Sequence, residues 1–248
     1  MPVCAADPIQ RPSLALLGAE PWRAAMDFAR NRLARDRPAM LGDGHPVVIF
    51  PGLGAGARSV AGLRQHCRAL GYQAFDWGQG LNTGPRGEPD RWLVELKTRM
   101  SALLSSHRQT ATFIGWSLGG LYARELAKLM APRVRQVITL GTPFNAEADH
   151  THAGWLLQLL NPGTRAWDAA WSRRLRATPP MQTVSIYSRS DGVVAWQTCR
   201  HEENSGVGRD IEVDSSHLGM GWNREVLDAV ADCLAKSSST GGTHETAH

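Results

Sequence analysis

Short apolar runs alternate along most of the chain with longer segments in which apolar residues recur every three or four positions. The continuous runs have the length and composition of strands that are buried on both faces, as in the middle of a parallel sheet. The longer segments have the periodicity of helices that cover such a sheet with one face. The expected strands are residues 47–50, 72–75, 112–116, 134–140, 182–187 and 210–213. This alternation predicts an α/β fold with a mostly parallel central sheet and helices on both faces.

The N-terminal segment, residues 1–40, departs from this alternation. From Pro21 onward Trp22, Met26 and Leu33 fall on one face of a helical pattern, while arginines recur at heptad spacing on another. We expect an amphipathic helix with Pro21 in its first turn, docked on its own domain. A basic amphipathic helix can also lie on a membrane surface, so peripheral membrane contact stays open as the alternative.

Residues 41–236 form the expected sheet domain, and residues 145–180 interrupt its rhythm. Two apolar helical stripes flank the turn Asn161-Pro162-Gly163. We expect a helical hairpin inserted between two strands, where it would form a lid or cap above the site. Core contacts for the insertion itself would also explain its tryptophans. Residues 237–248 are rich in Ser, Thr and Gly and are expected to be a disordered tail.

The third run ends at Gly115-Trp116-Ser117-Leu118-Gly119, and a helical pattern resumes directly after it. Gly-x-Ser-x-Gly between a strand and a helix predicts a sharp turn that holds the serine in a strained backbone conformation above the strand ends. The N-terminus of the helix directs positive charge toward the site. An ordinary serine in a glycine-rich turn would show the same five residues, so the interpretation depends on the rest of the chain.

An acid and a base follow two later strands. Asp191 lies in a turn directly after the fifth expected strand, and His217 lies in the loop after the sixth. The order Ser117, Asp191, His217 is expected when all three come from loops at one sheet edge. His217 would take the proton of Ser117 and later give it to the leaving group, while Asp191 would hold the ring tautomer. Asp214 is poorly placed to replace Asp191, because it precedes the histidine by only three residues.

The glycine-rich stretch after the first strand has two interpretations. Gly52-x-Gly54-x-x-Ala57, with Asp76 after the next strand, fits the dinucleotide-binding fingerprint of a nucleotide-dependent oxidoreductase. The other interpretation is an oxyanion loop, which turns a backbone N–H toward a nucleophile. Pro51 before the first glycine and the serine elbow two strands later favour the oxyanion loop. The expected oxyanion donors are the N–H groups of Leu53 and Leu118.

Composition and charge further limit the partners, metals and cellular location that we expect for this protein. The net charge of +4 is small and scattered, so no nucleic-acid partner is expected. Four widely spaced cysteines are typical of free thiols in a reducing compartment, and a single disulfide stays open as the alternative. The start of the chain lacks a secretory signal pattern, and no apolar run is long enough to span a bilayer, so we expect a cytoplasmic protein. His244-Glu245-x-x-His248 fits a zinc pattern without the packed helix and third ligand that zinc requires, so no metal is expected. His150, His152 and His201 are expected to be solvated loop residues.

Taken together, these motifs resemble those of the α/β-hydrolase superfamily, of the lipase and esterase type. The resemblance extends from Val47 to Leu234 and implies hydrolysis through a covalent acyl-serine without a cofactor. Pro51 stands where many relatives carry His-Gly, and Phe144 stands where many lipases have a histidine. The matching motifs are residues 47–54, Gly115 to Gly119, Leu140-Gly141-Thr142-Pro143-Phe144, Ser190-Asp191-Gly192-Val193-Val194 and Ser216-His217-Leu218-Gly219.

The sequence therefore predicts a carboxylic ester hydrolase whose substrate is a small-molecule or lipid ester with an apolar acyl group. We expect aromatic side chains to contact this substrate, namely Trp77, Trp116, Phe144 and Trp155. A thioesterase or an acyltransferase would use the same triad. A catalytically silent α/β-hydrolase scaffold that binds a hydrophobic ligand is an alternative of a different class.

Overall fold

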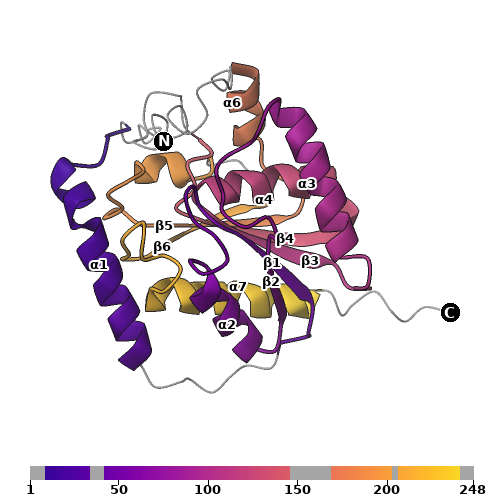
Figure 1. Cartoon of the computed structure of the whole chain (residues 1–248), viewed down its shortest axis with the longest axis horizontal. Coiled ribbons are helices and arrows are strands. Elements are labelled where there is room, and N and C mark those ends of the chain that lie inside the picture. Colours follow the sequence, from indigo (N-terminus) through magenta and orange to yellow (C-terminus); the bar gives the residue numbers. More distant parts are fainter. Residues whose placement is uncertain (1–8, 34–41, 146–168, 203–205, 241–248) are drawn as a thin grey trace, which may run out of the picture.

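A single sheet of six parallel strands forms the centre of the molecule (Figure 1). The computed structural model describes residues 9–33, 42–145, 169–202 and 206–240 of the 248-residue chain. All six expected strands are present and lie in the order β2-β1-β3-β4-β5-β6. Their bounds are β1 (Pro46–Phe50), β2 (Gln73–Asp76), β3 (Ala111–Trp116), β4 (Val134–Leu140), β5 (Gln182–Tyr187) and β6 (Gly208–Glu212). The all-parallel arrangement confirms the predicted α/β architecture.

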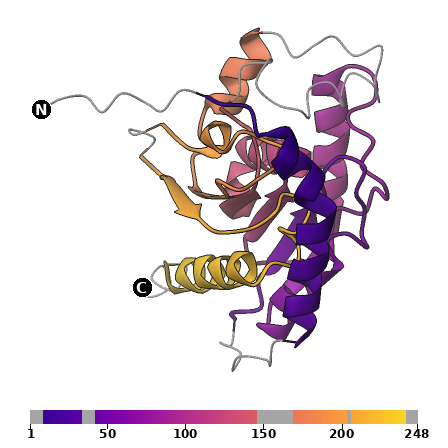
Figure 2. The ribbon, with the colours of Figure 1, turned by 90° about the vertical axis from the view of Figure 1, so that its left-hand side faces the viewer.

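Helices cover both faces of this sheet, and each face has its own apolar core (Figures 1 and 2). On one face, side chains of α2 (Ala61–Ala69) and α7 (Arg224–Thr240) pack on inward residues such as Val47 and Ile114. On the other, α3 (Pro89–Leu103) and α4 (Leu118–Leu129) pack on Val48 and Phe113. Successive strand residues point to opposite faces, which is why continuously apolar strands predict two covered faces.

Helix α1 (Leu14–Leu33) packs against the body with the face opposite to the one its amphipathic pattern indicates. Glu20 and Asp27 are its buried residues, whereas Leu14, Trp22 and Leu33 are 78%, 71% and 83% exposed. The helix is docked on its own domain as expected, but mainly through polar contacts, to which Phe28 adds packing against Trp222. It also begins seven residues before Pro21, so this proline lies inside the helix rather than in its first turn.

Part of the insertion expected to be a lid is packed firmly against the body. Helix α6 (Ala169–Arg176) contacts α4, and its Leu175 is buried in the core beside α3 and α4. The fully buried guanidinium of Arg124 donates to the carbonyls of Leu175, Arg176 and Ala177, at 3.3, 3.4 and 3.3 Å. The first stripe and Trp155 lie outside the described residues, so a lid stays a prediction.

Three further observations bear on the sequence predictions. Helix α7 continues to Thr240, four residues into the segment expected to be a disordered tail. Cys67, Cys199 and Cys233 are buried free thiols, while Cys4 lies outside the described residues. Among the helices that the structure describes, none combines the length and apolar character needed to cross a bilayer. The described residues also include two short 3-10 helices, η1 (Ala131–Arg133) and η2 (Trp196–Cys199).

Candidate active site

Ser117 lies between β3 and α4 in the strained backbone conformation expected of the elbow. Its φ of 53° and ψ of −123° make it the only non-glycine residue with positive φ in the described part of the chain. The flanking glycines are required by space, because a Cβ at Gly115 would overlap the backbone of Gly120 and one at Gly119 would overlap that of Phe50. The Ser117 N–H donates to the carbonyl of Leu140 at 2.8 Å, which fixes the turn at the carboxyl end of β4.

His217 and Asp191 form a buried pair. The ring Nδ1 of His217 lies 2.6 Å from Oδ2 of Asp191, and the two side chains are 4% and 1% exposed. The other carboxylate oxygen, Oδ1, accepts the N–H groups of Val193 and Val194, each at 2.8 Å. These backbone donors fix the carboxylate, so Oδ2 is held toward the imidazole. With Nδ1 donating to Asp191, the other ring nitrogen is left as the acceptor that a general base needs.

Opposing influences act on the pKa of His217. Burial disfavours the imidazolium and lowers this pKa, but the charge of Asp191, the hydrogen bond to it and the charge of Glu20 raise it by more. The pKa of His217 therefore lies above its ordinary value of 6.5. Such a group is tuned to hold a proton more strongly than a free histidine, which suits a base that must accept a serine proton.

The structure brings Ser117 and His217 to the same edge of the sheet. Trp116, the residue before the serine, donates its indole N–H to the His217 carbonyl at 3.1 Å. Gly141 also lies close to the His217 ring, because a Cβ added to this glycine would be 3.1 Å from Nδ1. Gly141 directly follows Leu140, whose carbonyl accepts the Ser117 N–H. Within the described residues, no hydrogen bond joins the Ser117 hydroxyl to the His217 ring. Catalytic hydrogen bonds commonly tighten only when substrate binds, so this geometry is compatible with the predicted roles.

Glu20 of α1 is a site residue that the sequence interpretation missed. Its Oε1 accepts the N–H groups of Gly192 and His217, at 2.8 and 3.0 Å, and its Oε2 accepts the N–H of Leu218 at 2.9 Å. One buried carboxylate thereby joins the loop that carries Asp191 to the loop that carries His217. The available signal was that Glu20 and Asp27 are the two acids in a helix of arginines and apolar residues.

Two more polar residues of α1 hold the same pair of loops. Arg23 donates to the carbonyl of Ser190 and, at 2.7 Å, to its hydroxyl oxygen. Asp27 accepts the side-chain N–H of Asn223 at 3.0 Å and the hydroxyl of Ser216 at 3.3 Å. With Glu20 they occupy successive turns on one side of the helix, so α1 holds together the Asp191 loop (residues 188–194), here called the acid loop for its proposed role, and the His217 loop (residues 213–223), here called the base loop.

The two expected oxyanion donors remain available. Leu118 is the first residue of α4, where a helix leaves its N–H groups without internal acceptors. In the part of the chain that the structure describes, neither the Leu118 nor the Leu53 N–H donates to a protein acceptor. The fully buried Asn82 binds the loop on both sides of Leu53. Its side chain donates to the carbonyl of Pro51 at 2.7 Å, and its backbone carbonyl accepts the Gly54 N–H at 2.8 Å.

The aromatic residues expected to contact substrate are mainly packed within the protein. Trp77 stacks on Tyr122, with ring centroids 6.2 Å apart and an interplanar angle of 7°, and Phe144 lies beneath the Arg124 guanidinium, 3.8 Å from its ring centroid. Trp116 is engaged with the His217 loop, as described above. Trp155 lies outside the described residues. Substrate contact by any of the four stays a prediction.

The structure gives less support to the other two kinds of site that the sequence raised, a dinucleotide site and a metal site. Asp76, the candidate ribose-binding acid, is paired with Arg64, and α2 begins four residues after Ala57 instead of opening from the glycine turn. His201, expected to be a solvated loop residue, is instead buried, with its Nδ1 2.7 Å from Asp210. That prediction was wrong because Asp210 and the Phe144 ring enclose the imidazole. Among the described residues, no group of three His, Cys, Asp or Glu could hold a metal.

Of the comparisons with known proteins, only the comparison with solved structures finds matches. No protein-family model and no curated protein matches the sequence. The monoacylglycerol lipase of Paleococcus ferrophilus matches with a TM-score of 0.58 at 14% identity, over 81% of this chain and 97% of that one. One of the metagenome-derived lipolytic enzymes LipS and LipT matches with a TM-score of 0.57 at 13% identity, over 80% and 96%.

An α/β superfamily hydrolase of Oenococcus oeni matches with a TM-score of 0.55 at 16% identity, over 80% of this chain and 94% of that one. These similarities, together with the six-stranded parallel sheet, show that the chain has the α/β-hydrolase fold. At such low identity a shared fold does not assign an activity.

Proposed function

We propose that this protein is a serine hydrolase that cleaves carboxylic esters of apolar acyl groups through an acyl-enzyme formed on Ser117. The observation that carries the proposal is the strained serine at the edge of the sheet where the buried His217–Asp191 pair also lies. Strain in a serine backbone is costly and persists where the surrounding structure enforces it, as at nucleophile elbows. Neither the elbow nor the oriented imidazole is needed to fold a parallel sheet.

In the first half of the reaction, the Ser117 oxygen attacks the ester carbonyl carbon while His217 takes the hydroxyl proton. The negative oxygen that forms on the carbonyl is stabilised by the N–H groups of Leu118 and Leu53 and by the N-terminus of α4. Collapse of this intermediate breaks the bond to the alcohol, which leaves with the proton from His217.

In the second half, water attacks the acyl carbon and gives a proton to His217. The bond to Ser117 then breaks, the serine oxygen recovers the proton, and the carboxylic acid departs. Asp191 keeps its negative charge throughout, holding the ring tautomer and stabilising the imidazolium. The raised pKa of His217 is the expected result of that interaction.

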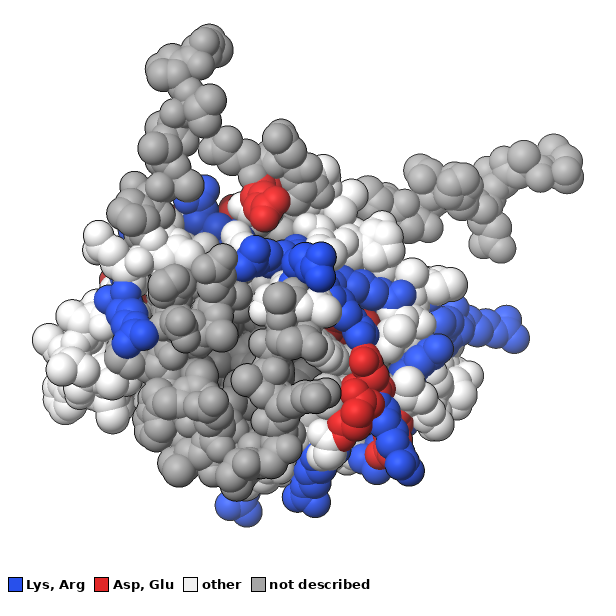
Figure 3. Space-filling view, turned by 90° about the horizontal axis from the view of Figure 1, so that it is seen from above, with Lys and Arg blue, Asp and Glu red and all other residues white. Residues whose placement is uncertain are grey.

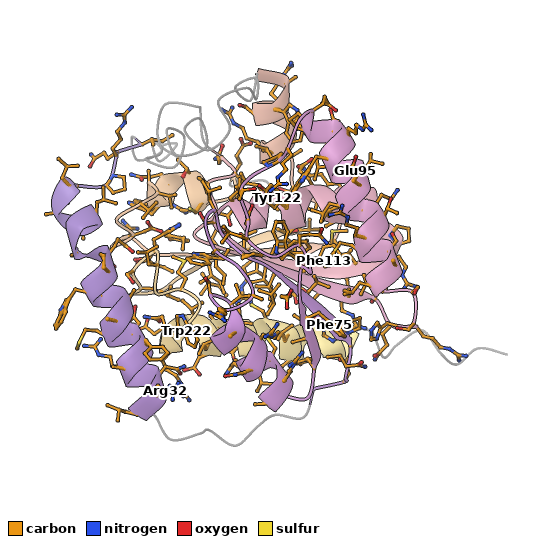
Figure 4. The ribbon with its side chains drawn as sticks, viewed as in Figure 1. Arg32, Phe75, Glu95, Phe113, Tyr122 and Trp222 are labelled. Carbon is orange, nitrogen blue, oxygen red and sulfur yellow. The ribbon has the colours of Figure 1, made fainter. Side chains whose placement is uncertain are left out.

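A small apolar hollow of about 10 Å³ lies on the side of the sheet that α4 covers, and it offers an apolar lining rather than a preformed acyl pocket. Its lining comes from α3, α4 and α6 and includes Leu121, which follows Ser117 by about one helical turn. Aromatic and aliphatic side chains line most of it, including Trp92, Tyr122, Trp171 and Leu175. Figure 4 shows Tyr122 in the interior of the molecule, beside α3. Such a lining favours a hydrocarbon chain over a sugar.

The test is hydrolysis of p-nitrophenyl esters of increasing acyl length, with a thioester of the preferred acyl group measured in parallel. We expect turnover by the wild-type protein that Ser117→Ala removes and that the exposed-serine control Ser101→Ala retains. A faster reaction with the thioester would move the assignment to a thioesterase. Turnover that survives Ser117→Ala, or no turnover of any ester by the folded protein, would contradict the proposal.

A further inference from the structure

The outward face of α1 is apolar along its whole length. Residues that recur every three or four positions fall on this face, opposite Glu20 and Asp27. They are Leu14, Gly18, Trp22, Ala25, Ala29 and Leu33, all of them exposed. Figure 1 shows α1 at the left margin of the molecule, with its outer side away from every other labelled element. Single exposed apolar residues are ordinary, but a contiguous exposed stripe with a tryptophan that is 71% exposed marks an interaction surface.

The inward contacts of α1 explain how this arrangement stays folded. Glu20, Arg23 and Asp27 bind the two active-site loops, and Phe28 packs edge-on against Trp222 with ring centroids 5.0 Å apart. Figure 4 shows Trp222 between α1 and α2, on the inner side of the helix. Because polar contacts hold the helix, its apolar stripe is not used for docking on the domain. The stripe can enter another apolar phase without detaching α1.

The charges of α1 indicate the kind of surface that the stripe contacts. Both acids of the helix are buried and engaged with loop N–H groups, so they present no negative charge outward. Its exposed charged residues are Arg30 and Arg32, and Figure 4 shows Arg32 at the lower end of the helix. Figure 3, seen from above, shows that the left margin of the molecule is mostly white. An apolar stripe bordered by arginines is the pattern of helices that lie in the interface of anionic membranes.

We propose that the outer face of α1 is a docking surface for a phospholipid bilayer that contains anionic lipids. Trp22, Leu14 and Leu33 enter the boundary between headgroups and acyl chains, while Arg30 and Arg32 bind headgroup phosphates. Docking places a bilayer against the helix whose inner face holds the acid and base loops. This inference concerns binding and does not require that the proposed hydrolysis is correct.

The experiment is flotation of the full-length protein with vesicles of phosphatidylcholine and phosphatidylglycerol, compared with vesicles of phosphatidylcholine alone. We expect binding to the anionic vesicles, weakened by salt. The double variant Leu14→Glu/Trp22→Glu should lower the vesicle partition coefficient by about tenfold or more, because it places charge in the apolar phase. Arg30→Glu/Arg32→Glu should lower it by about tenfold on anionic vesicles, because both headgroup contacts become repulsive.

Matched controls place the same changes elsewhere on the surface. Val94→Glu/Val207→Glu replaces two exposed apolar residues, and Arg86→Glu/Arg108→Glu reverses two exposed arginines; both should leave the partition unchanged. Unchanged circular dichroism and melting temperature would show that every variant is folded. Absence of vesicle binding, or equal loss in the α1 variants and their controls, would overturn the proposal. So would light scattering showing a dimer that Trp22→Glu dissociates, because the stripe would then join two copies of the chain.

Discussion

Glu20 accepts the backbone N–H of His217 at 3.0 Å, across a separation of 197 residues in sequence. The same carboxylate binds the N–H groups of Gly192 and Leu218, so three backbone donors from the acid loop and the base loop converge on one side chain. Their common partner is a residue of α1, which lies outside the sheet and its layers of covering helices. The positions of the proposed acid and base therefore depend on a helix that contributes no group to the reaction.

Replacing Glu20 by glutamine tests this dependence through stability. The amide offers one acceptor oxygen, and its NH2 group would face a backbone N–H that the carboxylate now binds. Leaving a buried donor without an acceptor should lower the free energy of unfolding by about 2 kcal/mol, measured in urea. The exposed control Glu95→Gln should change it by less than about 0.5 kcal/mol. Equal stability of the two variants would show that Glu20 does not hold the loops.

The same variant should shift the pH profile. His217 must be neutral to accept the serine proton, so kcat/KM rises with pH through the pKa of His217, which lies above 6.5. The charge of Glu20 raises this pKa, and Glu20→Gln should therefore move the acid limb of kcat/KM to lower pH. A limb that stays in place or moves to higher pH would contradict the assignment.

A linked effect on stability follows from the same pKa. Because folding raises the pKa of His217, the folded protein binds this proton more tightly than the unfolded chain does. The resulting stabilisation is fully present below about pH 6.5 and is lost as the pH rises through the folded pKa. Glu20→Gln should reduce this pH dependence of the unfolding free energy.

Asp191→Asn should inactivate the site through the tautomer of His217. The asparagine oxygen can keep the N–H groups of Val193 and Val194, which leaves its NH2 group to donate to the ring Nδ1. The ring proton is then on Nε2, where it prevents acceptance of the serine proton. We expect kcat to fall by about 10⁴-fold. Asp214→Asn, a change to an exposed acid in the same region, should leave kcat within about twofold; a large loss there would place the acid elsewhere.

The strain at Ser117 can be measured by comparing two inactive variants. Glycine tolerates the φ of 53° that this position requires, whereas alanine keeps the strain of a side chain at positive φ. Ser117→Gly should therefore be more stable than Ser117→Ala by about 1 kcal/mol, even though glycine is the more flexible residue when unfolded. An alanine variant of equal or greater stability would show that the elbow stores no strain.

Much of the fold and site could be predicted from the sequence because the determining signals are local. Continuously apolar runs indicated six strands, and the motif between β3 and α4 indicated the conformation of Ser117. The loop positions of Asp191 and His217 followed from where two strands end. Each of these inferences uses neighbouring residues and the rule that parallel strands end at one edge.

The contacts of α1 could not be predicted in this way. Its apolar periodicity favours burial of the stripe that contains Trp22, whereas the structure buries Glu20 and Asp27. Their partners are N–H and side-chain groups in distant loops, and no periodic pattern reveals such pairing. His201 was misjudged for the same reason, because its burial depends on Asp210 and on Phe144 from another part of the chain.

The most direct test of the central claim is intact-mass measurement after incubation with a fluorophosphonate. The probe reacts with a serine whose proton a neighbouring base can accept. We predict a single adduct that peptide mapping places on Ser117, absent from Ser117→Ala and formed much more slowly in Asp191→Asn. A folded wild-type protein that forms no adduct, or one that is labelled at another residue, would contradict the account.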